Sequence, residues 1–156
     1  MTLVRRAGPA DAEEVLRLRQ VMLDSVLGPD SSSAWHAESL PTVRGRLADP
    51  DGGFAAFVVD HPDRPDALAA LAAGTIDYRI GSPSNPRGAI GYVFSVATDP
   101  DARRRGYARA VMETLLDWFR ERGVLQVDLN ASAEGEPLYA SLGFVRKPDP
   151  SMRLRL

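Results

Sequence analysis

The residues with the clearest potential for chemistry are three consecutive arginines before a glycine, with a fourth arginine three residues later: Arg103, Arg104, Arg105, Gly106 and Arg109. They lie between a predicted strand that ends near residue 98 and a predicted helix. A helix N-terminus carries unpaired backbone N–H groups and the positive end of the helix dipole, and both favour a bound anion. A glycine lets that anion approach the backbone, and arginines add charge-assisted hydrogen bonds. This segment therefore predicts a site for a phosphate or diphosphate group.

Two other interpretations of the arginine cluster are a solvated surface and a docking patch for nucleic acid or protein. Four arginines beside a helix N-terminus are unfavourable to the helix dipole, which favours a ligand anion over a merely solvated surface. The formal net charge of −2 opposes general nucleic-acid binding, and aromatic residues do not alternate with the arginines. We therefore expect no nucleic-acid partner.

The composition is that of one globular domain over residues 1–156, with 44% hydrophobic and 26% charged residues. No apolar stretch is long enough to span a membrane, and the first residues do not resemble a secretory signal, so we expect a cytoplasmic protein without a membrane partner. Cysteine is absent, and His36 and His61 belong to no ligand cluster, so we expect no metal site. The Arg- and Ala-rich composition suggests a bacterial source.

Apolar periodicity predicts an α+β fold. Strands are expected over residues 3–5, 54–59, 68–79, 90–98, 124–129, 144–146 and 152–156. Helices are expected over residues 11–27, 33–47 with an interruption at Pro41, 105–122 and 137–142. The strand–helix–strand order across residues 90–129 implies a right-handed parallel crossover within an otherwise antiparallel sheet.

The arginine segment resembles the GNAT superfamily of acyl-CoA-dependent N-acyltransferases. The pyrophosphate motif of that family is Gln or Arg, two residues, Gly, one residue, and Gly or Ala. The matching residues here are Arg103-Arg104-Arg105-Gly106-Tyr107-Ala108. A second similarity lies downstream, in Pro137-Leu138-Tyr139 and Leu142-Gly143-Phe144. The resemblance covers residues 90–146, whereas the N-terminal half agrees only in its order of elements.

The resemblance implies a mixed, mostly antiparallel sheet flanked by helices, in which the parallel strands at 90–98 and 124–129 splay apart beside a β-bulge near Val96. The pantetheine arm of acetyl-CoA would pair with the exposed strand edge in that cleft. The residues that the resemblance assigns to the acyl donor are Val96, Ala97, Thr98, Arg103, Arg104, Arg105, Gly106, Tyr107, Ala108, Arg109 and Asn130. The alternative is a plain core strand at 96–98 and an ordinary strand-end asparagine.

Tyr139 is the catalytic residue that the resemblance implies. A phenol beside the thioester sulfur could hydrogen-bond or protonate the departing thiolate. The alternative is a packed tyrosine whose hydroxyl is satisfied by the backbone. Many members of the family use a glutamate as the base, but Phe94 occupies the aligned position. The residues left open as a base or water-ordering group are Ser95, Tyr92, Asp77, Glu38 and His36, and none is assigned.

These features lead to the hypothesis of an N-acetyltransferase that moves an acetyl group directly from acetyl-CoA to an amine. The missing glutamate favours a different hypothesis, a non-catalytic acyl-CoA sensor or regulatory domain, which Tyr139 opposes. The acceptor is left open between small-molecule and peptide amines. A homodimer is also left open.

Overall fold

The computed structural model describes residues 3–156, which form one five-stranded sheet with the strand order β1-β2-β3-β4-β5. Neighbouring strands are antiparallel except for the parallel pair β4–β5. The strands are β1 (Arg5–Arg6), β2 (Phe54–Asp60), β3 (Leu68–Tyr78), β4 (Ala89–Thr98) and β5 (Val127–Leu129). The helices are α1 (Ala12–Leu27), α2 (His36–Leu47), α3 (Tyr107–Glu121) and α4 (Glu136–Ser141), with short 3₁₀ turns η1 (Pro9–Asp11) and η2 (Pro100–Ala102). The predicted mixed, mostly antiparallel α+β fold is confirmed.

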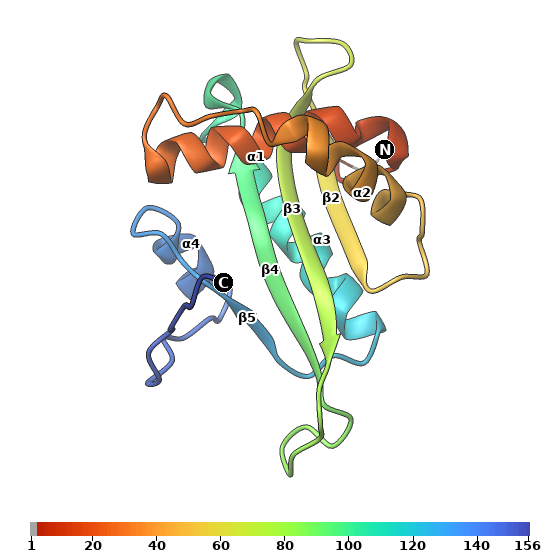
Figure 1. Cartoon of the computed structure of the whole chain (residues 1–156), viewed down its shortest axis with the longest axis vertical. Helices are drawn as coiled ribbons and strands as arrows, with labels where there is room; N and C mark the ends of the chain where they lie inside the picture. The colour runs from red at the N-terminus through yellow and green to blue at the C-terminus, as the bar shows by residue number, and fades with distance from the viewer. Residues whose placement is uncertain (1–2) are drawn as a thin grey trace.

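Helices cover both faces of the sheet (Figure 1). α1 and α2 lie on one face, α3 lies on the other, and α4 lies beside β5 near the C-terminus. β3 is apolar on both of its faces, as a strand between two helical layers must be. Ala70 and Ala72 belong to the core on the α3 side, whereas Leu71 and Ala73 belong to the core on the α1 side.

Two glycines allow α3 to approach the sheet closely. A Cβ at Gly74 would lie 2.7 Å from Phe119 Cζ, and a Cβ at Gly91 would lie 2.7 Å from Phe119 Cε1. Both distances are too short for carbon atoms, so the ring of Phe119 occupies the space that side chains on β3 and β4 would fill. This contact sets how closely the C-terminal half of α3 approaches β3 and β4.

The splayed strand pair expected from the sequence is present. β4 and β5 pair only through Gly91–Val127, Tyr92–Asp128 and Val93–Leu129, after which the strands separate. On the other side of β4, Ala73 pairs with Phe94 and Leu71 pairs with Ala97, so two residues, Ser95 and Val96, lie opposite Ala72. This is a β-bulge, and Ser95 has a left-handed φ of 55° at that point. The bulge near Val96 is therefore confirmed.

Several predicted elements differ from the structure. The strands expected at 144–146 and 152–156 are absent: neither segment joins the sheet, and the apolar side chains of Val145, Met152 and Leu154 are exposed, so no buried face favours a strand. The strand expected over 124–129 is shorter, and α2 continues through Pro41 where an interruption was expected. Within residues 3–156, no helix combines the length and apolar character needed to span a membrane.

Candidate active site

The N-terminus of α3 presents an open group of backbone donors. Gly106 is the N-cap with φ 79°, and the preceding Arg104 is also left-handed with φ 64°. The first amide that bonds into the helix is that of Ala110, which donates to the Gly106 carbonyl at 3.1 Å. No side chain caps the helix, and its first turn has no acidic residue. The amides of residues 107–109 thus remain for an anion, and a Cβ on Gly106 would project into open space.

The arginines around this helix start are exposed and have few acidic partners. Across the described residues, no ion pair involves Arg103 or Arg104. Arg105 lies only 4.0 Å from the Asp63 carboxylate. Arg109 contacts Glu113 at 3.5 Å and donates a hydrogen bond to Ser141 Oγ on α4. The cluster therefore keeps free cationic groups beside unpaired amides, as an anion site requires.

An ion-pair network around the buried Asp99 holds the loop before these arginines. Asp99, 5% exposed, accepts hydrogen bonds from Arg17 on α1 at 3.0 Å and from Arg64 in the β2–β3 loop. Arg64 also donates to Asp101 at 2.9 Å, and His61 Nε2 lies 2.9 Å from the same carboxylate. The hydrogen bond from His61 is the main cause that holds the pKa of Asp101 below its usual range. The network joins three segments at the C-terminal end of β4.

The same network bears on the expectation that the histidines belong to no ligand cluster. His61, Asp99 and Asp101 place their ligand-type atoms within 4.8 Å of one another, and His61 is buried. This cluster was not predicted, because its members are separated by about 40 residues in the chain. Arg64 and Arg17 contribute two positive charges to these carboxylates, which makes the cluster an ion-pair network and a poor cation site.

The gap between β4 and β5 leaves one main-chain edge of β4 without a strand partner. Ala97 and Thr98 pair with β3 on one side, whereas pairing with β5 ends at Val93. Val96 and Leu129 pack against the same core cluster as α3. Asn130 follows the last residue of β5 and is exposed at the mouth of the gap. An extended ligand with amide groups could pair with this free edge.

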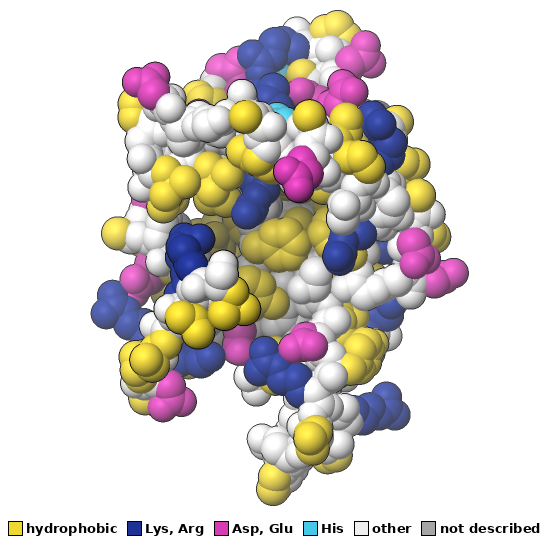
Figure 2. Space-filling model, in the orientation of Figure 1, with side chains coloured by type: hydrophobic (Ala, Val, Ile, Leu, Met, Phe, Trp, Pro, Cys, Tyr) yellow, Lys and Arg dark blue, Asp and Glu magenta, His cyan; other side chains and the backbone are white. Residues whose placement is uncertain are grey.

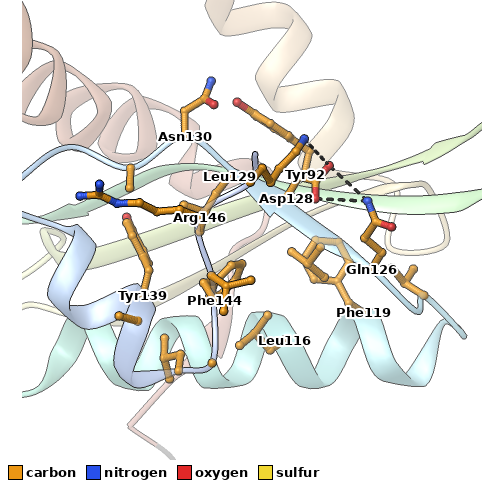
Figure 3. Close-up of a pocket in the computed structure, with 18 of the residues that line it drawn as sticks. Tyr92, Leu116, Phe119, Gln126, Asp128, Leu129, Asn130, Tyr139, Phe144 and Arg146 are labelled. Atoms are coloured by element: carbon orange, nitrogen blue, oxygen red, sulfur yellow. Dashed lines mark hydrogen bonds and ion pairs between the residues drawn. The ribbon is translucent and has the colours of Figure 1, made fainter. Parts of the chain in front are cut away.

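Tyr139 projects from α4 with a free hydroxyl. Its ring is partly buried and packs edge-on against Phe144, with ring centroids 6.0 Å apart (Figure 3). Among residues 3–156 no hydrogen bond satisfies the hydroxyl, so the backbone-bonded alternative is not what the geometry shows. Burial raises the pKa of Tyr139, which keeps the phenol protonated and able to donate at neutral pH. The contact from Arg109 to Ser141 places α4 beside the N-terminus of α3.

A cleft of about 1310 Å³ includes Tyr139 and Asn130 but none of the arginines at the start of α3. It runs along β5 between the second half of α3, α4 and the C-terminal segment, as Figure 3 shows. An anion bound at the α3 amides would therefore lie outside this cleft.

The residues left open as a base are scattered, and most have other partners. Asp77 is paired with Arg79 at 2.8 Å, and His36 contacts Gln20 Oε1 at 2.9 Å. The hydroxyl of Ser95 accepts a hydrogen bond from Arg19 Nη1 at 2.5 Å, which leaves its O–H donor and one lone pair without a partner within residues 3–156. Tyr92 lines the large cleft, and Glu38 is exposed on α2. Arg19 itself was missed, since no local pattern distinguishes it from other helix arginines.

Comparison with known proteins connects this geometry to a family. The family model described as acetyltransferase (GNAT) family matches residues 21–144. The curated relatives include the [ribosomal protein bS18]-alanine N-acetyltransferase of Escherichia coli K12, which is 46% identical over 55 residues, or 33% of this chain and 37% of that protein. They also include glucosamine 6-phosphate N-acetyltransferase of Trypanosoma brucei brucei, 36% identical over 68 residues, or 44% of this chain and 46% of that protein. These matches span less than half of each relative.

Solved structures resemble the chain over nearly its full length. A GCN5-related N-acetyltransferase from Ralstonia eutropha has a TM-score of 0.77 and 26% identity, and the match covers 97% of both chains. A predicted acetyltransferase from Clostridium acetobutylicum, crystallised with acetyl-CoA, has a TM-score of 0.81 and 22% identity, covering 97% of this chain and 94% of that one. Because the family model matches residues 21–144, which is most of the chain, the chain belongs to the acetyltransferase (GNAT) family.

Proposed function

We propose that the protein is an N-acetyltransferase that moves an acetyl group from acetyl-CoA directly to an amine. The observation that carries this proposal is the open N-terminus of α3, where unpaired amides and exposed arginines lie next to the gap between β4 and β5. The structure of the predicted acetyltransferase from Clostridium acetobutylicum was determined with acetyl-CoA, which supports the choice of donor.

The residues present fit such a donor. The amides of residues 107–109 and the guanidinium groups of Arg103, Arg104, Arg105 and Arg109 suit a diphosphate, and Gly106 leaves room for it. The free edge of β4 at residues 96–98 suits the amides of the pantetheine arm, with Asn130 at the mouth. When bound, acetyl-CoA would supply an activated thioester that an amine can attack.

Tyr139 is the proposed proton donor to the leaving thiolate. Its hydroxyl is free, its raised pKa keeps the proton in place, and α4 is held against the start of α3. A proton donor is needed only when the thioester breaks, so this group should act on the rate and not on donor affinity. The sensor hypothesis lacks a reason for an unpaired phenol at this position.

Calorimetric titration with acetyl-CoA and an assay of thiol release over a panel of amines test the proposal. We expect donor binding, a higher melting temperature in millimolar acetyl-CoA, and thiol release with at least one amine. Absence of binding at millimolar acetyl-CoA would reject both the enzyme and the sensor. Tight binding without thiol release across the panel would favour the sensor.

We further propose that the protein works in the bacterial cytoplasm on a small-molecule or peptide amine, without nucleic acid as a partner. The bacterial sources of several relatives and the net charge of −2 support this assignment. Fractionation of the source cell with an antibody against the chain would test the compartment.

A further inference from the structure

Arg19 is a partly buried cation without an acidic partner. It lies on α1, and its side chain reaches the bulge of β4, where Nη1 donates to Ser95 Oγ at 2.5 Å. Within the described chain no carboxylate lies in ion-pair distance of its guanidinium. Arg17, two residues earlier, is a direct contrast, because Glu14 binds it at 2.6 Å and Asp99 binds it at 3.0 Å. The fold therefore neutralises one of these arginines and leaves the other available.

Leaving a guanidinium in this position is unfavourable without an anion. A guanidinium carries five N–H donors, and the single hydroxyl of Ser95 accepts from one of them. Burial lowers the pKa of Arg19, and no neighbouring acid opposes this effect. A ligand oxyanion would restore the lost hydration through charge-assisted hydrogen bonds.

A pocket of about 340 Å³ adjoins this guanidinium. Besides Arg19, its lining has three apolar side chains, namely Leu23 and Leu27 on α1 and Trp35 before α2. It also has three serines, Ser31, Ser32 and Ser39. Among the described residues that line it, Arg19 is the only charged one. In the orientation of Figure 1, Figure 2 shows a broader hollow below α1, with an apolar floor and with several Lys or Arg side chains around it.

The pocket wall is fixed by its own hydrogen bonds. Gln20 Oε1 accepts a hydrogen bond from Trp35 Nε1 at 3.0 Å, and Gln20 Nε2 donates to Ser31 Oγ at 2.8 Å. Asp24 accepts from Ser31 and from Gln20, so its carboxylate is already engaged on the α1–α2 connection. The segment 28–35 is thereby held against α1, and the cavity beside Arg19 exists before a ligand arrives.

We infer that the acetyl acceptor carries an anionic group, a carboxylate or a phosphate, which binds Arg19 while an apolar or neutral part of the molecule fills the pocket lined by Trp35. This inference rests on the proposed function. Ser95 precedes Val96, whose main chain lies at the gap proposed for the thioester arm. Through Ser95, the guanidinium of Arg19 lies one residue along β4 from the gap proposed for the thioester arm, so an anion bound to Arg19 would hold the acceptor close to that gap.

Matched pairs of amines test the inference. Leucine and leucinamide differ in the carboxylate, and glucosamine 6-phosphate and glucosamine differ in the phosphate. Because a hydrogen bond to a charged group is typically worth more than one to a neutral group, we expect the anionic member of at least one pair to show a KM lower by about 10- to 100-fold. The pair that shows the preference identifies the anion as carboxylate or phosphate. Equal KM values within both pairs would overturn the inference.

Substitutions assign the preference to Arg19. Arg19→Gln should raise the KM for the anionic amine to that of its neutral partner, while Arg19→Lys should retain part of the preference. Arg44→Gln is the control and should change neither value, because Arg44 is an exposed arginine on α2 that pairs with Glu13 and lines neither cavity. An unchanged preference in a folded Arg19→Gln protein would reject the role.

A binding readout separates this inference from the proposed function. Trp35 lines the pocket, so its fluorescence should respond when leucine or glucosamine 6-phosphate binds, and the response should disappear in Arg19→Gln. If acetyl-CoA does not bind, the proposed function fails while this titration still tests the anion site. If acetyl-CoA binds and both pairs are used equally, the function stands and the inference is wrong. If no amine is used and no probe changes the fluorescence, the anion site is likewise rejected.

Discussion

Replacing Gly106 by alanine tests the anion site at the start of α3, and the structure supplies the expected magnitudes. Gly106 has φ 79°, a region in which an L-residue costs about 1–2 kcal/mol relative to glycine. A Cβ there would meet no atom within 4 Å, so strain is the only loss expected in the free protein. For a chain of this length the melting temperature should fall by about 2–8 °C.

Donor binding should suffer more than stability in the Gly106→Ala protein. The new methyl group projects into the space proposed for the phosphates, and losing one charge-assisted hydrogen bond there weakens binding about tenfold or more. Gly123→Ala is a matched control, because Gly123 has φ 75° at the other end of the same helix and a Cβ there meets only an ordinary contact with Arg87 at 3.6 Å. Calorimetric titration with CoA and thermal unfolding should be measured on both proteins. Equal CoA affinities in the two variants would refute the reasoning.

Three further outcomes follow from the site and the core. Tyr139→Phe should lower kcat about 10²-fold while the dissociation constant for acetyl-CoA stays unchanged, and full turnover would remove the proton-donor role. The hydrogen bond from Arg5 holds the pKa of Asp11 below its usual range, so the stability it contributes is present above about pH 4 and is lost as pH falls through the lowered pKa. Between pH 6 and pH 2.5 the melting temperature should therefore fall less steeply for Asp11→Asn than for the unsubstituted protein. Gly91→Ala should destabilise the fold by about 1–3 kcal/mol in urea unfolding, because its Cβ would overlap Phe119, and an unchanged midpoint would contradict the close packing described for α3.

The parts of the site that the sequence could predict are those encoded by neighbouring residues. An arginine run with one glycine before an amphipathic helix predicts a helix start and exposed charges within a few residues, and the structure has both. The bulge near Val96 and the splay of β4 from β5 came from the resemblance, because strand separation depends on pairing between segments more than 30 residues apart. Both features are present in the structure.

The parts that could not be predicted depend on contacts between distant residues. Arg19 and Ser95 are 76 residues apart, and Asp99 joins side chains from α1 and from the β2–β3 loop. Neither pairing leaves a periodic signal in the chain. The expected C-terminal strands failed for a different reason, since alternation of apolar residues favours a strand only where one face is buried, and Val145, Met152 and Leu154 are exposed.

The double arginine contact to Asp99 has a consequence for the speed of ligand capture. Because the C-terminal end of β4 is tied to α1 and to the β2–β3 loop, the backbone that leads into the arginine segment is already in place in the free protein. Little ordering entropy then opposes association, and exposed positive charges attract a polyanion over a distance set by the ionic strength. The association rate constant for CoA should consequently be high and should fall with added salt, whereas the dissociation rate should carry the effect of substitutions at the amides.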